Sequence, residues 1–332
     1  MKIDTNQIIK QIVLKDFGNM DRNIFSQVRW SSLLKKASSN RVLYVFVQNL
    51  YKSDFSLNPK QKEDLQKIIE VGNQKTKAFR DTIEFLKKNL GFQNIPYLVV
   101  KTFKYIDYVT FDVDVLVPYE SFDAAQKVLA DNGCQICPHP RKQGFHQRNC
   151  VKEGLLNIDL HRKFYWQGFE HIDLDFVWKN ARTRIINGIE CPCPSLEADF
   201  LLHNKQLVYE RYYITLLDFL AVKFARKSAN FDMESVVTQV EKYKWAKSFK
   251  NLLAHLNTID TALYNKGSNA IEMPFLYPYI QVWQQFFEIT QGQKNIPVYD
   301  FLYYHFAFGR YYLSKKARFP YYQHWFDFAL LT

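Results

Sequence analysis

Apolar residues recur with two different spacings along this chain, and the change of spacing predicts three regions. Up to residue 92 the spacing is helical, with one long helix expected between the start signal at Asn58 and Pro59 and the stop at Gly91. From residue 93 to 194 short alternating segments predict strands, and from Ser195, a good helix cap, helical spacing returns. We therefore expect a helical region 1–92, an α/β core 93–194 and a helical domain 195–332 with an aromatic-rich tail.

The central region predicts a small mixed sheet with flanking helices, which is an α+β fold. Residues 121–132 have the apolar spacing of a helix, and Gly133 ends it. A hairpin is expected where residues 143–151 and 155–161 flank Glu153-Gly154, and one more strand, 183–193, is expected to close the sheet. The remaining expected strands cover residues 97–100 and 111–117.

The strand FDVDVLV places two carboxylates side by side. Alternation puts Asp112 and Asp114 on one face, while Val113 and Val115 point to the other. Like charges on one face are unfavourable unless a cation, basic groups or water compensates them. The pattern therefore indicates bound counter-charge, although a solvated strand face is the simpler explanation of an isolated DxD.

A third carboxylate, Asp159, lies in another alternating segment, NIDLH. If the two strands are neighbours, three carboxylates converge on one sheet face, and such a group holds one or two magnesium ions in phosphoryl chemistry. An exposed strand acid and an ion pair with Arg162 are the alternatives for Asp159. His161 shares the face of Asp159, so it either contacts substrate or has a structural role.

Composition limits the class of protein without naming a function. The 332 residues are 47% hydrophobic, which is enough for a sizeable core, and no apolar run reaches the roughly 20 residues of a membrane-spanning helix. The first residues do not show the basic, apolar and small-residue segments of a signal peptide in that order. We therefore expect a cytoplasmic protein. The formal charge of +11 favours polyanionic partners.

The five cysteines do not suggest a disulfide framework. Cys134 and Cys137 form a CxxC, and Cys191 and Cys193 form a CxC. Neither pair has a partner at zinc-finger spacing, so small buried side chains explain them as well as zinc does.

The acidic motifs resemble the polymerase beta-type nucleotidyltransferases. Lys101-Thr102, a nine-residue spacer, Asp112-Val113-Asp114-Val115 and the later Asp159 reproduce the order of that signature. The chain is most similar to the uncharacterised nucleotidyltransferase family of bacteria and archaea, over about residues 25–230. The stretches WSSLL, DVDVLV, IDLH and SLEADFLLHNKQL carry this likeness.

The resemblance implies the polymerase beta-type core fold between the two helical regions, a magnesium or manganese ion, and an NTP substrate. It makes Asp112, Asp114 and Asp159 the catalytic metal ligands, with Asp159 assisting deprotonation of the acceptor. Where the family has glycine, the phosphate turn here has Lys101 and Thr102. The expected nucleotide-binding residues are Lys101, Thr102, Lys104, Lys205 and Arg211.

The resemblance leaves the acceptor open between RNA such as tRNA, a protein side chain and a small molecule. A catalytically inactive relative that binds RNA or a protein is the main alternative, and a magnesium phosphohydrolase is another. Asp218, inside an apolar helix, either pairs structurally with Lys205 or Arg211 or holds the acceptor.

Overall fold

The computed structural model describes residues 5–18, 20–102, 104, 108–138, 146–166, 169–210, 213–264 and 275–276. Arg211 and the expected aromatic helices after residue 276 lie outside this part of the chain. In the described residues no helix is both long and apolar enough to cross a membrane.

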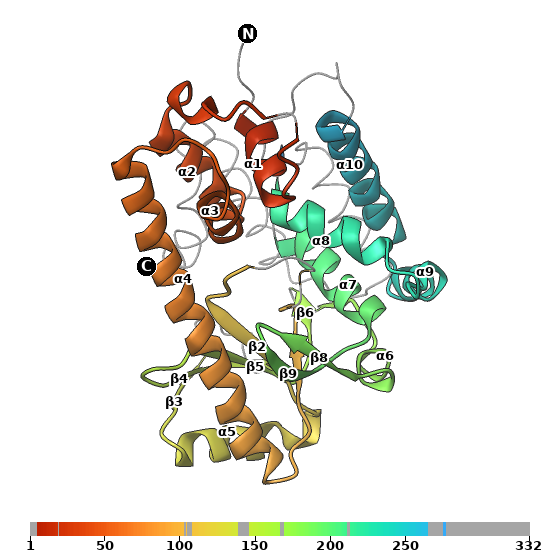
Figure 1. Cartoon of the computed structure of the whole chain (residues 1–332). Coiled ribbons are helices and arrows are strands. Elements are labelled where there is room, and N and C mark those ends of the chain that lie inside the picture. The colour runs from red at the N-terminus through yellow and green to blue at the C-terminus, as the bar shows by residue number, and fades with distance from the viewer. Residues whose placement is uncertain are drawn as a thin grey trace, which may run out of the picture.

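Helices make up both ends of the described chain, and strands make up its middle (Figure 1). The helices are α1 (Thr5–Val13), α2 (Trp30–Ser39), α3 (Leu43–Tyr51), α4 (Pro59–Leu86), α5 (Phe122–Asp131), α6 (Leu174–Lys179), α7 (Leu196–Lys205), α8 (Leu216–Arg226), α9 (Met233–Lys242) and α10 (Ala246–Tyr264). The strands are β1 (Leu98–Val100), β2 (Asp112–Leu116), β3 (Gln135–Pro138), β4 (Gln147–Val151), β5 (Asn157–His161), β6 (Tyr165–Trp166), β7 (Phe169–Glu170), β8 (Arg182–Ile186), β9 (Ile189–Cys193), β10 (Tyr213–Ile214) and β11 (Phe275–Leu276).

The long helix α4 begins and ends where its sequence signals predict. The Asn58 side chain accepts a hydrogen bond from the Gln61 backbone, and the Gln61 side chain accepts one from the Asn58 backbone, each at 2.9 Å. This capping box satisfies two amides that the first turn leaves unpaired. A π-helical turn, Lys87–Gly91, follows α4 and contains the expected stop.

The central sheet has five strands in the order β1-β2-β5-β4-β3 and is mixed. Strands β2 and β5 are parallel, whereas each of the other neighbouring pairs is antiparallel. The expected hairpin is present as β4 and β5, and β3 is an edge strand that the sequence patterns did not predict. The α+β class with a small mixed sheet is confirmed.

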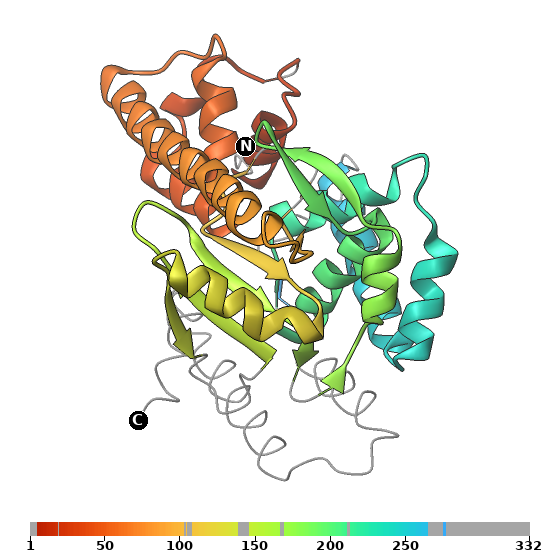
Figure 2. The same cartoon turned by 90° about the horizontal axis from the view of Figure 1, so that it is seen from below.

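One face of the sheet packs on helices α4 and α5. Val113, Val115 and Val117 are fully buried in a core with Phe79 of α4 and Phe122 of α5. Figure 2 shows both helices lying across this face of the sheet. Alternation therefore turns Asp112, Asp114 and Leu116 to the opposite face, as the sequence predicts.

The opposite face joins the core that the N-terminal and C-terminal helices share. Leu98, Val100 and Leu116 of the sheet are part of one buried cluster with residues of α1 to α3 and of α6 to α10. Figure 1 shows α1 to α3 beside α8 and α10, above the sheet. The acidic face of β2 thus lies toward the helical part of the molecule.

The expected strand 183–193 is wrong in two respects, because it forms two strands, β8 and β9, and they are not members of the central sheet. Strands β8 and β9 pair only with each other among the described strands. Asn187 and Gly188 both have positive φ, 51° and 80°, and such a pair reverses the chain as a tight two-residue turn. The Asn-Gly sequence is itself the strongest short hairpin signal.

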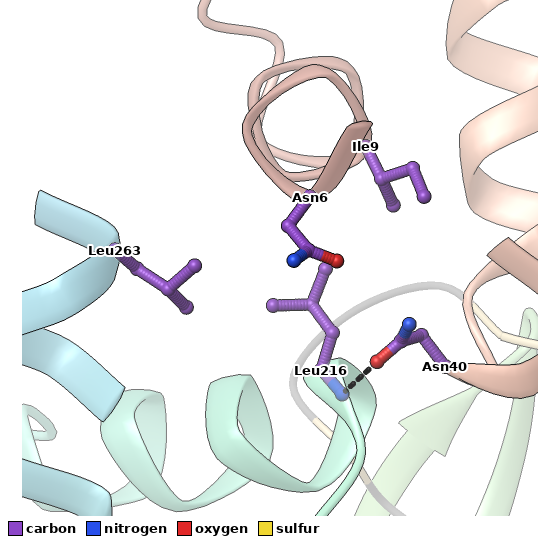
Figure 3. A pocket seen from close by; sticks show the side chains of 5 residues that line it. All are labelled: Asn6, Ile9, Asn40, Leu216 and Leu263. Carbon is purple, nitrogen blue, oxygen red and sulfur yellow. Dashed lines mark hydrogen bonds between the residues drawn. The ribbon is translucent and has the colours of Figure 1, made fainter. Parts of the chain in front are cut away.

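A small pocket lies within the helical core (Figure 3). It is lined by Asn6 and Ile9 of α1, Asn40, Leu216 of α8 and Leu263 of α10. The Leu216 amide donates a hydrogen bond to the Asn40 side-chain oxygen at 3.1 Å (Figure 3). None of the described residues that line the pocket is ionisable, so we interpret it as a packing feature between helices.

Candidate metal site on strands β2 and β5

Two carboxylates and an imidazole meet on neighbouring strands. Asp114 of β2 lies directly opposite Asp159 of β5 in the parallel register, and His161 follows on the same face of β5. One ligand atom from each of these three residues lies within 4.8 Å of the others. The arrangement follows from pairing two strands in register, because alternate residues of both strands then share one face.

Asp112 lies one step further along the same face of β2 and is exposed. The Thr110 hydroxyl is 2.8 Å from the Asp112 carbonyl oxygen and 3.5 Å from the carboxylate oxygen Oδ1. Among the described residues, the cluster of possible metal ligands comprises Asp114, Asp159 and His161, and Asp112 is not part of it. The role expected for Asp112 as a metal ligand stays a prediction.

The two clustered carboxyls have pKa values shifted in opposite directions. Burial, together with the charges of Asp114 and Asp112, raises the pKa of Asp159 to about 7. Burial alone would also raise the pKa of Asp114, but the Lys101 ammonium and the His161 ring hold it well below its usual range. Two acids that share one face but differ in counter-charge behave in this way.

Lys101 supplies that counter-charge. Its Nζ is 2.5 Å from Asp114 Oδ1, and the His161 Nε2 is 2.9 Å from the same oxygen. The Lys101 ammonium also lies 5.6 Å from the centre of the Phe164 ring. An ammonium therefore contacts the carboxylate that we expected to bind a metal.

The backbone at Lys101 has a left-handed conformation, with φ of 59°. This is uncommon for a residue with a side chain and fits the position where the family has glycine. The Lys101 amide donates a hydrogen bond to Asp199 Oδ1 of α7 at 3.0 Å. Asp199 is buried and is 3.5 Å from Arg184 of β8, so a charged helix residue fixes the turn after β1.

The structure places the other two expected turn residues in contact with the protein interior. Thr102 is buried, and its hydroxyl donates to the Val100 carbonyl at 3.0 Å. Lys104 is also buried, with its Nζ 2.9 Å from His203 Nδ1. Their expected contacts with phosphate stay predictions.

Helices α7 and α8 carry a buried network of charged side chains. His203 Nε2 is 3.5 Å from Asp218 Oδ1, and Arg41 Nη1 is 3.8 Å from that oxygen. The other carboxylate oxygen of Asp218 accepts hydrogen bonds from the Thr215 amide at 3.1 Å and from the Thr215 hydroxyl at 2.6 Å. Asp218 therefore pairs with His203 and Arg41, and its expected pairing with Lys205 or Arg211 stays a prediction.

The two remaining expected nucleotide ligands lie on or after α7. Lys205 is buried at the end of the helix, and Arg211 lies outside the described residues. Asp199 and His203, which sequence reasoning missed, are four residues apart and so share one face of α7. That spacing of an acid and a histidine in an apolar helix is the signal that could have identified them.

Arg162, Lys163 and the cysteines are not members of the described Asp114, Asp159 and His161 cluster. Arg162 packs 4.6 Å from the ring centre of Tyr119 and 5.1 Å from that of Phe122, so the alternative ion pair with Asp159 is not the contact it makes. Lys163 is 3.3 Å from Glu170. Burial raises the pKa of the Cys150 thiol to about 12, and no cysteine of the described chain joins a metal-ligand cluster.

A family model described as uncharacterised nucleotidyltransferase matches residues 26–259, which is well over half of the chain. The chain belongs to this family. The resemblance of the acidic motifs is thereby confirmed, and the matched region includes β2, β5 and helices α7 to α9. No protein with a curated description matches the sequence.

The chain is also similar to three solved structures. The lincosamide antibiotic adenylyltransferase LnuA, bound to lincomycin, is 15% identical over 46% of this chain and 98% of its own, with a TM-score of 0.33. The antibiotic-resistance factor ANT(2'')-Ia is 12% identical over 54% and 94%, with a TM-score of 0.36. An antigenic nucleotidyltransferase-like protein from Paracoccidioides brasiliensis is 15% identical over 61% and 98%, with a TM-score of 0.33. At these scores the family assignment rests on the sequence match alone.

Proposed function

We propose that this member of the family is a metal-dependent nucleotidyltransferase, which transfers a nucleoside monophosphate from an NTP to an acceptor and releases pyrophosphate. The observation that carries the proposal is the direct pairing of Asp114 with Asp159 on parallel strands of the small mixed sheet. Two acids held this close are unfavourable unless positive charge or protonation compensates them, and nucleotidyl transfer uses a divalent cation that would do so.

The residues of the cluster fit a hard divalent cation. Two carboxylates supply the oxygen ligands that magnesium and manganese prefer, and the His161 imidazole offers one nitrogen beside them. An ammonium already contacts Asp114, which indicates that this position favours positive charge. When bound, the metal neutralises charge on the triphosphate and orients the reacting oxygens.

The protein residues have separate roles in this proposal. Asp114 and Asp159, with Asp112 at the exposed end of the face, hold the metal. Asp159 also accepts the proton of the acceptor hydroxyl, a role that the family resemblance implies for it. Lys101 binds the triphosphate, and the family resemblance implies a nucleotide-binding role for Thr102, Lys104, Lys205 and Arg211 as well.

The acceptor class is tested together with the reaction. The protein is incubated with each NTP, labelled at the α-phosphate, with magnesium or manganese and with either total RNA, a protein extract or small hydroxylated compounds. We expect label in one of the three fractions and one pyrophosphate released per transfer. Asp114→Asn should abolish the labelling, whereas the matched variant Asp131→Asn, on the exposed end of α5, should not.

Two outcomes would contradict the proposal. Release of inorganic phosphate instead of pyrophosphate would indicate a phosphohydrolase. Absence of both labelling and metal-dependent NTP binding would indicate a non-catalytic member that binds RNA or a protein. The observation that favours this second candidate is Lys101, whose side chain stands in the turn where the family has glycine and contacts Asp114.

A further inference from the structure

The Lys101 ammonium and a metal ion would compete for the same carboxylate, that of Asp114. Lys101 Nζ lies 2.5 Å from Asp114 Oδ1, and Asp114 is one of the two carboxylates in the candidate metal site. A divalent cation bound there would place a double positive charge within a few ångströms of the ammonium. In a partly buried site that repulsion is weakly screened, so the two cations cannot both remain on Asp114.

The backbone of Lys101 is fixed, so only its side chain can move out of the way. Asp199 accepts the Lys101 amide at 3.0 Å, and Asp199 is in turn 3.5 Å from Arg184. The side chain itself is 14% exposed, which leaves it an open side. A left-handed φ of 59° is unfavourable for lysine, and such backbone strain concentrates at functional sites.

A nucleotide would give the displaced ammonium a new partner. The triphosphate brings several negative charges to the turn that follows β1, and a lysine on a flexible stem can follow them by rotating its side chain. Positive and negative charges in the site are then balanced both without and with the metal and the nucleotide. In the empty site the ammonium neutralises Asp114, and in the loaded site the metal neutralises the acids while the ammonium neutralises phosphate.

We propose that Lys101 is an exchangeable counter-ion, which occupies Asp114 in the empty site and moves to the triphosphate when metal and NTP bind together. This inference rests on the proposed function. It explains why a lysine stands at a strained position next to the acids, and it makes the site selective for the metal–nucleotide complex over the free metal. The Lys101 ammonium opposes binding of the free metal ion but favours binding of the metal–nucleotide complex.

Removing the charge should therefore change two affinities in opposite directions. We expect Lys101→Met, which keeps the length of the side chain without the ammonium, to tighten the binding of manganese alone by about tenfold or more, since a competing cation is lost. The same variant should weaken the binding of a non-hydrolysable NTP analogue, at saturating manganese, by about tenfold. Manganese binding is followed by electron paramagnetic resonance and analogue binding by calorimetry, at pH 8.

Matched variants separate charge from backbone strain. Lys101→Gly removes the ammonium and relieves the left-handed φ, and it should tighten manganese binding as Lys101→Met does. Lys101→Arg keeps the charge and should leave manganese binding weak. Lys75→Met removes an equal charge from α4, where the ammonium lies 5.6 Å from the Phe111 ring, and should change manganese affinity less than twofold.

Three results would overturn the inference. Unchanged or weaker manganese binding in both Lys101→Met and Lys101→Gly would show that the ammonium does not compete with metal. Tighter binding in Lys101→Gly alone would assign the effect to strain. Unchanged binding of the NTP analogue in Lys101→Met would show that the lysine does not move to phosphate. By contrast, failure of every variant and of the wild-type protein to bind manganese would refute the metal site itself, and with it the proposed function.

Discussion

Acidic side chains in two regions of this protein differ in how far neighbouring protein groups compensate their negative charge. On the sheet, Asp114 and Asp159 face each other across paired strands, and the pKa of Asp159 is raised to about 7 by burial and by its acidic neighbours. On helix α8, Asp218 is fully buried but accepts two hydrogen bonds from Thr215, with His203 and Arg41 within 4 Å.

The difference distinguishes a binding site from a structural ion pair. Burying a carboxylate is unfavourable unless it is hydrogen-bonded and paired, and the environment of Asp218 meets both conditions from within the protein. Among the described residues, the sheet acids have the Lys101 ammonium at Asp114 as their counter-charge, and a bound cation would neutralise the remaining negative charge. A perturbed carboxyl with an incomplete set of partners is the stronger functional candidate.

The largest expected effect is on catalysis. Asp114→Asn and Asp159→Asn should each lower the rate of label transfer by at least about 10³-fold, because each removes a charged metal ligand. For Asp159→Asn we expect the free energy of unfolding to change by less than about 1 kcal/mol or to increase, since a like charge is removed. Transfer assays and urea denaturation measure the two. Transfer within tenfold of the wild-type rate would contradict the role of these acids.

Asp218→Ala should have the reverse profile. It leaves the Thr215 amide and hydroxyl without their acceptor and the nearby bases without counter-charge, so we expect a loss of about 3 kcal/mol in the free energy of unfolding. The transfer rate per folded molecule should stay within a few-fold of wild type. Urea denaturation with Asp218→Asn as the matched control, which keeps one oxygen acceptor, tests this. A loss below 0.5 kcal/mol, as is usual at a surface position, would remove the contrast.

His161 should have an intermediate effect, because it acts through Asp114. Its Nε2 is 2.9 Å from Asp114 Oδ1, so it orients this carboxylate and also offers a nitrogen ligand. We expect His161→Ala to weaken manganese binding by about 10- to 100-fold, as is usual for residues that orient metal ligands. His161→Gln, whose amide can donate to Asp114, should recover part of the loss. Equal binding by His161→Ala and wild type would leave His161 with only a packing role against Phe164.

The smallest expected effect is the pH dependence of stability in the metal-free protein. The pKa of Asp159 is higher in the folded state than in the unfolded state, so its contribution favours folding at low pH and is lost as pH rises through about 7. The pKa of Asp114 is lowered, so its contribution is already complete at pH 5 and does not change up to pH 8.

Raising the pH from 5.5 to 7.5 should therefore destabilise the wild-type protein relative to Asp159→Asn by about 1 kcal/mol. Urea denaturation of both proteins in the presence of a chelator measures the difference. Parallel pH profiles of the two proteins would show that the environment of Asp159 does not oppose its ionisation.

Much of the sheet could be predicted because neighbouring residues encode it. The alternation of Asp112, Asp114 and Leu116 with valines gives both the strand and the faces of its side chains. NIDLH likewise gives the second strand, with Asp159 and His161 on one face. The Asn187-Gly188 sequence also indicates a turn. The prediction of a single strand across it is wrong, because a two-residue turn joins two strands.

The partners of the charged residues could not be predicted in the same way. Lys101 and Asp199 are 98 positions apart, and Lys104 and His203 are 99 apart. No local pattern links such pairs, since their contact depends on how α7 packs against the end of β1. The expected phosphate ligands Thr102 and Lys104 were chosen by residue type, which does not reveal that the protein interior already engages them.

The sequence by itself determined the helices, the alternating strands and the set of acids that a divalent cation would need. These features depend on periodicity and on signals within a few residues, which act before distant segments meet. The tertiary structure decided that Asp114 pairs with Asp159, that Asp112 lies at the margin, and that Lys101 supplies the positive charge. Each of these depends on strand register and on contacts between segments far apart in the chain, where burial and neighbouring charge set the behaviour of each group.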